Sequence, residues 1–345
     1  MAATNCHIRH YGCFATGILL FVIPSARAQD DQQTLRNVFE RAREHSDIKA
    51  KGMPGFVLRG DVRIWVKKDT ATDGKYLLVW TPEGRWKEEL AFPGYTRTRI
   101  GDGTQFWQVR SPVGENPAAY ELDMLLMNSR APKTKEGDRF SKTGPNPVAG
   151  GNVECIKQSA HPPYGWVYCF DSSSGDLLEV SSGHNTTDIA WKVDWQVHSN
   201  FQEWSANKVP LLLQGHNGKQ TVLEVKFEEI KPLPQLSADF FAPPTGATIW
   251  ADCRDGEIWK LKERTQPEYP RSARMQHREG TVMLHAVIGE DGKLSDLKIA
   301  HSAGQELDSS AMAAVSHWRY ERTAACSEAK GRSETFIDVV YSLQN

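Results

Sequence analysis

Three residues near the C-terminal end of the chain have side chains that could form a catalytic triad. His301, Ser302 and Asp308 stand close together in the sequence, and a serine activated by a histidine that a carboxylate orients is the nucleophile of many hydrolases. Ser302 and Asp308 nevertheless stand on either side of Gly304, where apolar residues at helical spacing begin and a helix is expected to start. Serine and aspartate are preferred at such positions because they cap helices. We therefore expect capping residues here, not an active site.

The sequence contains no other recognisable catalytic motif. HExxH, GxSxG, GxGxxG and GxxxxGK[ST] do not occur, and the glycine cluster IGDGTQFW lacks a third glycine and a helix that it could open. The histidines are scattered, and His285 stands among apolar residues of an expected strand, which indicates packing rather than metal ligation. We expect a protein that is not an enzyme and that has no metal and no cofactor.

Tryptophans are frequent in the middle of the chain, on segments that alternate like strands. They are Trp65, Trp80, Trp86, Trp107, Trp166, Trp191, Trp195 and Trp204. Such residues can simply fill the inner face of a curved sheet. The alternative is a concave apolar surface that takes an acyl chain or an apolar peptide, and we assign Trp65, Trp80, Trp86 and Trp107 to this candidate cavity.

Residues 1–28 have the pattern of a secretory signal peptide. Arg9 precedes the apolar stretch FATGILLFVI, and Pro24 and the small residues Ala26 and Ala28 follow it. Ten apolar residues are too few to cross a bilayer, which takes about 20. We predict that this segment is cleaved; a retained membrane anchor is the alternative. The formal net charge is −2, and loss of a leader with two arginines makes the mature chain more acidic, which argues against nucleic acid as a partner.

Four cysteines remain after the predicted leader. They are Cys155, Cys169, Cys253 and Cys326. An even number of cysteines in an exported protein indicates disulfides, and four of them allow three connectivities. Cys155 and Cys169 flank the turn sequence HPPYG, so that their strands can face one another across a hairpin. We favour this pairing, which leaves Cys253 to pair with Cys326.

The mature chain is longer than one core usually supports, so two domains are expected. In residues 29–245, helical periodicity at 31–46 is followed by short alternating segments broken by Gly, Pro, Asn and Asp, which predict a large antiparallel sheet. A second helix is expected at 118–130. Residues 246–264 are predicted to be a linker. Residues 265–345 predict a small domain with the order α-β-β-α-β, in which Asp291 and Gly292 form a hairpin turn. The predicted fold class is α+β.

The run DVRIWVKKDTATDGKYLLVWTPEGRWKEELAFPGYTRTRIGDGTQFWQ resembles the periplasmic lipoprotein-carrier (LolA/LolB-like) superfamily. The resemblance lies in a helix followed by strands, with Trp80 and Trp86 flanking a turn and Phe92-Pro93 at an edge. It covers about residues 30–245. It implies an incomplete antiparallel barrel, a half-barrel, whose cavity binds acyl chains beneath covering helices.

Residues 265–345 look like the TonB C-terminal domain family. The resemblance rests on features in a consistent order: Tyr269-Pro270, Ala273, Gly280-Thr281-Val282, Asp291-Gly292, Ser302-x-Gly304, Leu307-Asp308 and Trp318-Arg319-Tyr320. It implies a periplasmic domain that docks an outer-membrane transporter, or another envelope protein, by adding a strand of the partner to its sheet.

The predicted partner-binding strand is the last one, at 335–343. Its central residues are Phe336, Ile337, Asp338, Val339, Val340 and Tyr341. Alternation predicts that Ile337, Val339 and Tyr341 pack on the helices and that the other three lie on the opposite face. A cleavable leader and dispersed prolines differ from the anchor and proline-rich spacer of an energy transducer, so the resemblance favours docking over a motor link. The alternative function is a lipid or lipoprotein carrier that uses the half-barrel cavity.

Overall fold

The computed structural model describes residues 26–67, 70–112, 116–144, 152–159, 165–182, 189, 191–237, 239–253 and 258–343. The predicted signal peptide lies outside this part of the chain, except for its last three residues. These three begin helix α1 (Ala26–Ser46). No helix in the described residues is both long enough and apolar enough to cross a membrane.

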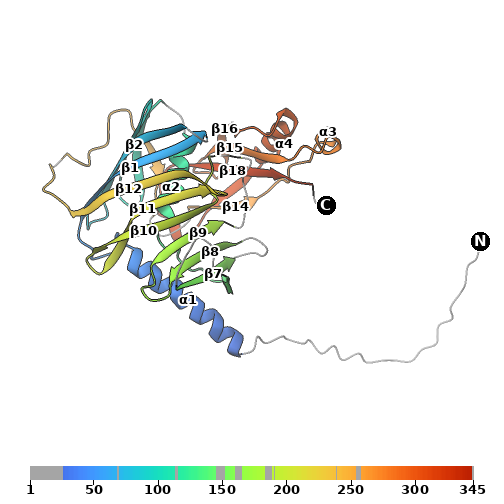
Figure 1. Cartoon of the computed structure of the whole chain (residues 1–345). Coiled ribbons are helices and arrows are strands. Elements are labelled where there is room, and N and C mark those ends of the chain that lie inside the picture. Colours follow the sequence, from blue (N-terminus) through green and yellow to red (C-terminus); the bar gives the residue numbers. More distant parts are fainter. Residues whose placement is uncertain are drawn as a thin grey trace, which may run out of the picture.

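A large antiparallel sheet forms the N-terminal part of the molecule, as predicted (Figure 1). In the described residues its strands are β1 (Phe56–Lys67), β2 (Thr70–Trp80), β3 (Trp86–Phe92), β4 (Tyr95–Gly101), β5 (Gln105–Ser111), β6 (Arg139–Thr143), β7 (Val153–Ser159), β8 (Trp166–Asp171), β9 (Leu177–Ser182), β10 (Trp195–Trp204), β11 (Asn207–Asn217), β12 (Gln220–Pro232) and β13 (Thr248–Ala251). The order is β13-β5-β4-β3-β2-β1-β12-β11-β10-β9-β8-β7-β6. Pairing of β1 with β12 joins two meanders, and the two end strands do not pair, so the barrel stays open.

Two glycines let aromatic rings lie against the inner side of the sheet. Gly74 stands opposite Phe92, and Gly101 is paired with Trp86. A Cβ atom at either glycine would lie within 2.4 Å of the facing ring. Each ring therefore covers a glycine of the next strand, an arrangement that helps a sheet to curve.

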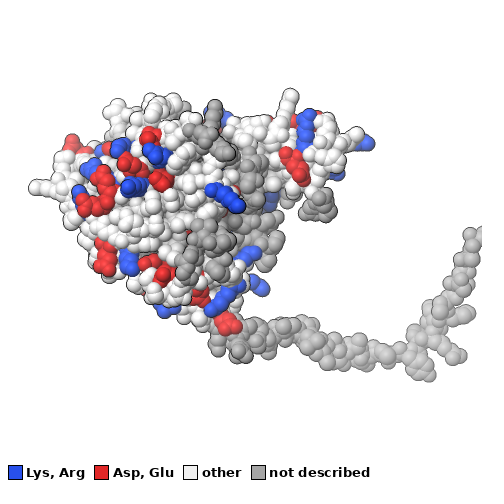
Figure 2. Space-filling model, in the orientation of Figure 1, with Lys and Arg blue, Asp and Glu red and all other residues white. Residues whose placement is uncertain are grey.

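Two helices cover the concave side of the sheet, as expected for a half-barrel. Helix α1 packs Leu35, Phe39 and Ala42 on the arm formed by β6 to β9. Helix α2 (Pro117–Met127) packs on the other arm and begins at Asn116, whose side chain accepts the Ala118 N–H. The outer side of β1 and β2 carries exposed ion pairs, and positive and negative side chains are interspersed over this face (Figure 2).

The C-terminal domain has the predicted order of elements. They are α3 (Arg271–Met275), β15 (Gly280–Ile288), β16 (Leu294–His301), α4 (Gln305–Val315) and β18 (Ser333–Tyr341), with a further strand β17 (Arg319–Arg322) and a 3-10 turn η1 (Ala324–Cys326) inserted before β18. The sheet order is β16-β15-β18. The motif Trp318-Arg319-Tyr320 lies beyond the second helix. Helix α4 ends at Val315, and Arg319 and Tyr320 open β17, which pairs with β14.

The segment 246–264, which we predicted as a linker, contains two short strands. Strand β13 pairs with β5 of the large sheet, and β14 (Trp259–Glu263) pairs with β17 of the C-terminal domain. The physical reason is that β5 would otherwise leave its outer backbone groups unpaired at a sheet edge. The start of the segment is therefore paired with the half-barrel, and its end is paired with the C-terminal domain.

Both predicted disulfides are present. Cys155 and Cys169 occupy directly opposite positions on β7 and β8, with their Cα atoms 4.0 Å apart. The HPPYG turn between them lies outside the described residues except for Gly165. Cys253 follows β13 and is bonded to Cys326 at the end of η1. The second disulfide therefore links the large sheet covalently to the C-terminal domain.

Candidate functional site

Helix α2 lies between the half-barrel and the C-terminal domain, and its side chains serve both. Ala119, Leu122 and Leu125 are buried in the half-barrel core. Tyr120 points the other way, and its ring lies 4.6 Å from the ring of Phe336 on β18. Helix α2 is therefore the contact element between the two domains.

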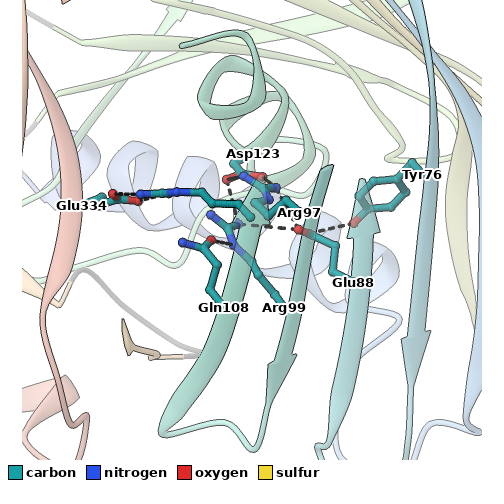
Figure 3. Close-up of polar contacts among 8 residues, drawn as sticks. Tyr76, Glu88, Arg97, Arg99, Gln108, Asp123 and Glu334 are labelled. Carbon is teal, nitrogen blue, oxygen red and sulfur yellow. Dashed lines mark hydrogen bonds and ion pairs between the residues drawn. The ribbon is translucent and has the colours of Figure 1, made fainter. Parts of the chain in front are cut away.

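A buried charge network fixes α2 to the concave side of the sheet (Figure 3). Arg97 on β4 donates to Asp123 on α2 through both terminal nitrogens, at 3.0 and 2.6 Å, and to Glu88 on β3 at 2.8 Å. Arg99 also donates to Asp123, at 2.8 Å, and Tyr76 donates to Glu88 at 3.2 Å. The Arg97 side chain is fully buried, so it holds its two carboxylates in a medium of low polarity.

The network favours the charged forms of Asp123 and Arg97 in spite of their burial. Burial alone would raise the pKa of Asp123, but Arg97 and Arg99 outweigh it and hold that pKa below its usual value. Burial disfavours the charged Arg97 guanidinium, and Asp123 and Glu88 outweigh it so that its pKa rises. The Tyr76 pKa is raised by burial and by Glu88. These are the features of a structural clamp with paired charges.

A cavity of about 350 Å³ opens beside this network, between the end of α1, helix α2 and the sheet. Its apolar side chains are Ile48, Leu58, Leu78, Leu126, Met127, Val209, Pro210, Leu213 and Phe227, and its charged ones are Asp47, Lys49, Glu88, Arg99, Asp123, Arg130 and Asp252. Burial and the nearby Arg130 lower the pKa of Lys49 to about 8. The cavity is thus half apolar and half charged.

The four tryptophans that we assigned to the cavity are not among its lining residues. Trp80 is buried in the adjoining core, where it stacks on Phe56. Trp86 covers Gly101 and donates to Asp252 at 3.1 Å. Ile64, just before Trp65, and Gln108, just after Trp107, point to the concave side of the sheet. Because side chains alternate along a strand, Trp65 and Trp107 lie on the outer side.

The alternation predicted for the partner-binding strand is present in β18. Ile337, Val339 and Tyr341 are buried against α4 in the core of the C-terminal domain. Phe336, Asp338 and Val340 lie on the opposite face. Val340 is 57% exposed, whereas Phe336 faces Tyr120 of α2.

The opposite face of β18 is partly covered by the N-terminal domain. Glu334 at its start pairs with Arg110 of β5, with 2.6 Å between Nη1 and Oε2 (Figure 3), and Asp338 pairs with Lys192. His285 on the neighbouring strand lies 3.4 Å from Glu334. Neither Arg110 nor Lys192 belongs to a motif, so sequence reasoning missed both contacts.

Strand β18 is also an edge strand of its sheet. The Tyr120 ring packs on Phe336, with 4.6 Å between the two ring centroids, and burial raises the Tyr120 pKa. Because backbone groups of alternate residues in a strand point to the same side, Asp338 and Val340 present their N–H and C=O groups to the same outer edge. The part of β18 that a partner strand could reach therefore begins beyond Phe336.

Ser302 and Asp308 lie around the start of helix α4, as expected, but neither caps it: the N-cap is Gly304, which makes no side-chain hydrogen bond to the helix. Ser302 donates to Asp308 at 2.6 Å, and Asp308 accepts the Ala303 N–H at 3.0 Å. Gly304 precedes the first residue of α4. The two polar side chains thus bond backbone N–H groups of the turn that precedes the helix, those of Ala303 and Gly304. In the described residues, no group of three or more His, Cys, Asp or Glu side chains is placed to hold a metal ion.

Glu121 is a buried acid at the contact between the domains. Its carboxylate accepts the Val193 N–H at 3.0 Å. Burial raises its pKa to about 7; Lys192 and the Val193 N–H oppose the shift, and Asp338 and Asp194 add to it. A group with a raised carboxyl pKa makes folding more favourable when it is protonated.

We expect Glu121→Gln to remove a pH dependence of stability. Between pH 4.5 and about 7 the unfolded carboxyl has lost its proton and the folded one has kept it, so the free energy of unfolding falls as the pH rises. At about 1.4 kcal/mol per pKa unit the loss amounts to about 3 kcal/mol. The glutamine can still accept from Val193, so the variant should match the wild type at pH 4.5 and exceed it at pH 7.5 in urea titrations.

The wild type and Glu121→Gln must be compared at each pH because a second buried group, His198, also makes stability depend on pH. Burial lowers the pKa of His198 to about 4, although the hydrogen bond to the Leu177 carbonyl acts to raise it. Because the unfolded histidine binds a proton first as the pH falls, the free energy of unfolding decreases through the same pH range. The contribution of His198 is common to both proteins and cancels in their difference. Parallel stability curves for wild type and Glu121→Gln would contradict the role of Glu121.

The fold is a half-barrel domain joined to a small α/β domain in which β18 is an edge strand. Residues 265–342 match the model of a family described as "Gram-negative bacterial TonB protein C-terminal". This match confirms the resemblance found for that region. No curated protein sequence matches the chain at the significance applied.

Three solved structures illustrate what the chain is similar to. A LolA superfamily protein from Nitrosomonas europaea has 8% identity and a TM-score of 0.37, over 60% of this chain and 97% of that one. A DUF1329 family protein from Desulfovibrio piger has 8% identity and a TM-score of 0.40, over 61% and 96%. The TonB C-terminal domain of Pseudomonas aeruginosa has 20% identity and a TM-score of 0.24, over 27% and 93%. We draw no functional conclusion from these three likenesses.

Proposed function

We propose that this is a non-enzymatic, exported protein of the periplasm whose C-terminal domain docks an envelope protein by strand pairing. The single observation that supports this most is that β18 is an edge strand whose outer backbone groups, from Asp338 onward, have no strand beside them in the described residues. An extended partner segment that adds to such an edge gains main-chain hydrogen bonds. An outer-membrane transporter is the partner that the TonB resemblance implies.

The N-terminal half-barrel then positions the docking domain. Arg110, Lys192 and Tyr120 hold β18 from the side that α4 leaves uncovered. This contact leaves little room for the domain to extend away from the half-barrel, which favours docking at a fixed place over transmission of force along a spacer.

Carriage of a lipid or lipoprotein acyl chain is the second candidate, and the cavity beside α2 is the observation that favours it. The charged half of its lining weakens this candidate, because an acyl chain there would displace water from Lys49, Arg99 and Asp123 without offering them hydrogen bonds. Native mass spectrometry of the protein purified from cells tests it. A co-purified lipid would support the carrier, and its absence would count against it.

We expect Val340→Pro to abolish docking while the domain stays folded. The Val340 N–H points to the outer edge, so proline removes a donor for the partner strand without removing a ladder bond to β15. Val339 is unsuitable because its side chain is buried and its N–H points toward β15. Capture of envelope proteins by the tagged full-length chain, quantified by mass spectrometry, should fall at least tenfold for the docked partner.

Val340→Thr is the matched control. Threonine is β-branched like valine and keeps the N–H, so capture should stay within twofold of the wild type. Equal capture by wild type and Val340→Pro would rule out strand pairing at this edge. Circular dichroism of both variants checks that the C-terminal domain is folded.

A further inference from the structure

Two hollows meet at the outer edge of β18. One, of about 310 Å³, lies between β18 and the N-terminal domain. The other, of about 180 Å³, follows the strand edge from Asp338 to Ser342 and is bounded by residues 264–269. Asp338 and Val340 line both hollows, so the two adjoin along the strand.

The walls of the two hollows differ in chemistry. The first is mainly apolar, with Met124 and Leu125 of α2, Trp166 of β8 and Val180 of β9. Trp166 is 40% exposed, which leaves its ring accessible. The second hollow is bounded by more polar side chains, including Arg264 and Gln266.

An extended chain sends successive side chains to opposite sides. A segment paired with β18 from Asp338 onward would place alternate side chains toward Trp166 and the remaining ones toward Arg264. The contact of the Tyr120 ring with Phe336 covers the start of the strand, so we expect a paired stretch that begins at Asp338 and is short. A short paired stretch gains little from backbone bonds alone, and the apolar wall supplies the additional contact.

We propose that the two hollows form one composite site for an extended partner segment that alternates apolar and polar residues and is held by both domains. The proposal rests on the strand pairing proposed above and adds a binding role for the half-barrel. Unpaired backbone groups along one wall select a peptide over a compact apolar ligand. The Lys192–Asp338 ion pair marks the end of the site nearest α2.

Selection from a random octapeptide display library on the purified full-length protein tests this proposal. We expect the enriched peptides to alternate apolar and polar residues. Synthetic copies of them should lose at least tenfold in affinity on Trp166→Glu and on Val340→Pro, measured by fluorescence anisotropy. Met275→Glu is the matched control, because Met275 is 72% exposed on α3 and lines neither hollow, and it should leave the affinity unchanged.

The outcomes separate this proposal from the proposed function. Peptides that lose affinity on Val340→Pro and not on Trp166→Glu would overturn the composite site and leave strand pairing in place. Peptides that bind all variants equally would overturn both. A library that yields no binding peptide, or enriched peptides without alternation, would likewise overturn the composite site.

Discussion

Arg97→Ala should lower the free energy of unfolding of the half-barrel by about 3–5 kcal/mol, the range found when one partner of a buried ion pair is removed. The side chain is fully buried between Glu88 and Asp123. Without it, two carboxylates remain close together in a medium of low polarity, and Asp123 loses the guanidinium that lowers its pKa. Urea denaturation followed by tryptophan fluorescence measures the loss.

The control for Arg97 is a surface ion pair of the same type. Arg63 pairs with Asp73 at 2.6 Å, with both side chains more than half exposed. Arg63→Ala should leave the urea midpoint nearly unchanged because water screens such pairs. A change of less than about 1 kcal/mol for Arg97→Ala would show that water reaches the network, against its observed burial.

Arg97 also bears on docking, because it anchors the helix that touches β18. Asp123, which it holds, is on the same helix as Tyr120, whose ring packs on Phe336. We therefore expect Arg97→Lys, which keeps one charge but loses the forked geometry, to loosen this contact as well.

Replacing Cys253 and Cys326 together by serine should cost about 4 kcal/mol of stability. The disulfide closes a loop of 73 residues, and chain-entropy arguments give a larger effect for longer loops. The loop includes β14, β15, β16 and α4, so most of the C-terminal domain is affected. Thermal and urea unfolding of the purified double variant measure the loss.

The other disulfide is the comparison. Cys155 and Cys169 are separated by 14 positions, for which the same argument gives about 3 kcal/mol. The variant without the 253–326 bond should be the less stable of the two. Peptide binding at β18 should weaken in this variant alone, because of the two disulfides only this one joins the two domains. The reverse order of stability would contradict the loop-length argument.

The fold class was largely predictable from local patterns. Alternation between polar and apolar residues predicted the antiparallel strands, and helical periodicity predicted α1 and α2. Once Cys155 was paired with Cys169, only Cys253 and Cys326 were left to form the second disulfide. The turn and helix start around Ser302 and Asp308 could be recognised because they depend on neighbours only a few positions away, but the predicted capping role was wrong, since Gly304 is the N-cap.

The candidate site was less predictable. Trp80 and Trp86 were placed on the correct side of the sheet, but the facing Phe56 and Gly101 make them core residues, and Trp65 and Trp107 lie on the outer side. Whether a tryptophan fills a core or lines a cavity depends on the residues of other strands. Segment 246–264 carries edge strands for the same reason: its pairing depends on β5 and β17.

The sequence by itself determined the two kinds of domain, the disulfide partners and the alternation of β18, since each depends on residue types at short or fixed spacing. Only the tertiary structure decided how much of β18 a partner can reach. That depends on Tyr120, Arg110 and Lys192, which are more than a hundred residues away along the chain. They contact the strand because the half-barrel folds back on the C-terminal domain, and no local pattern records such a contact.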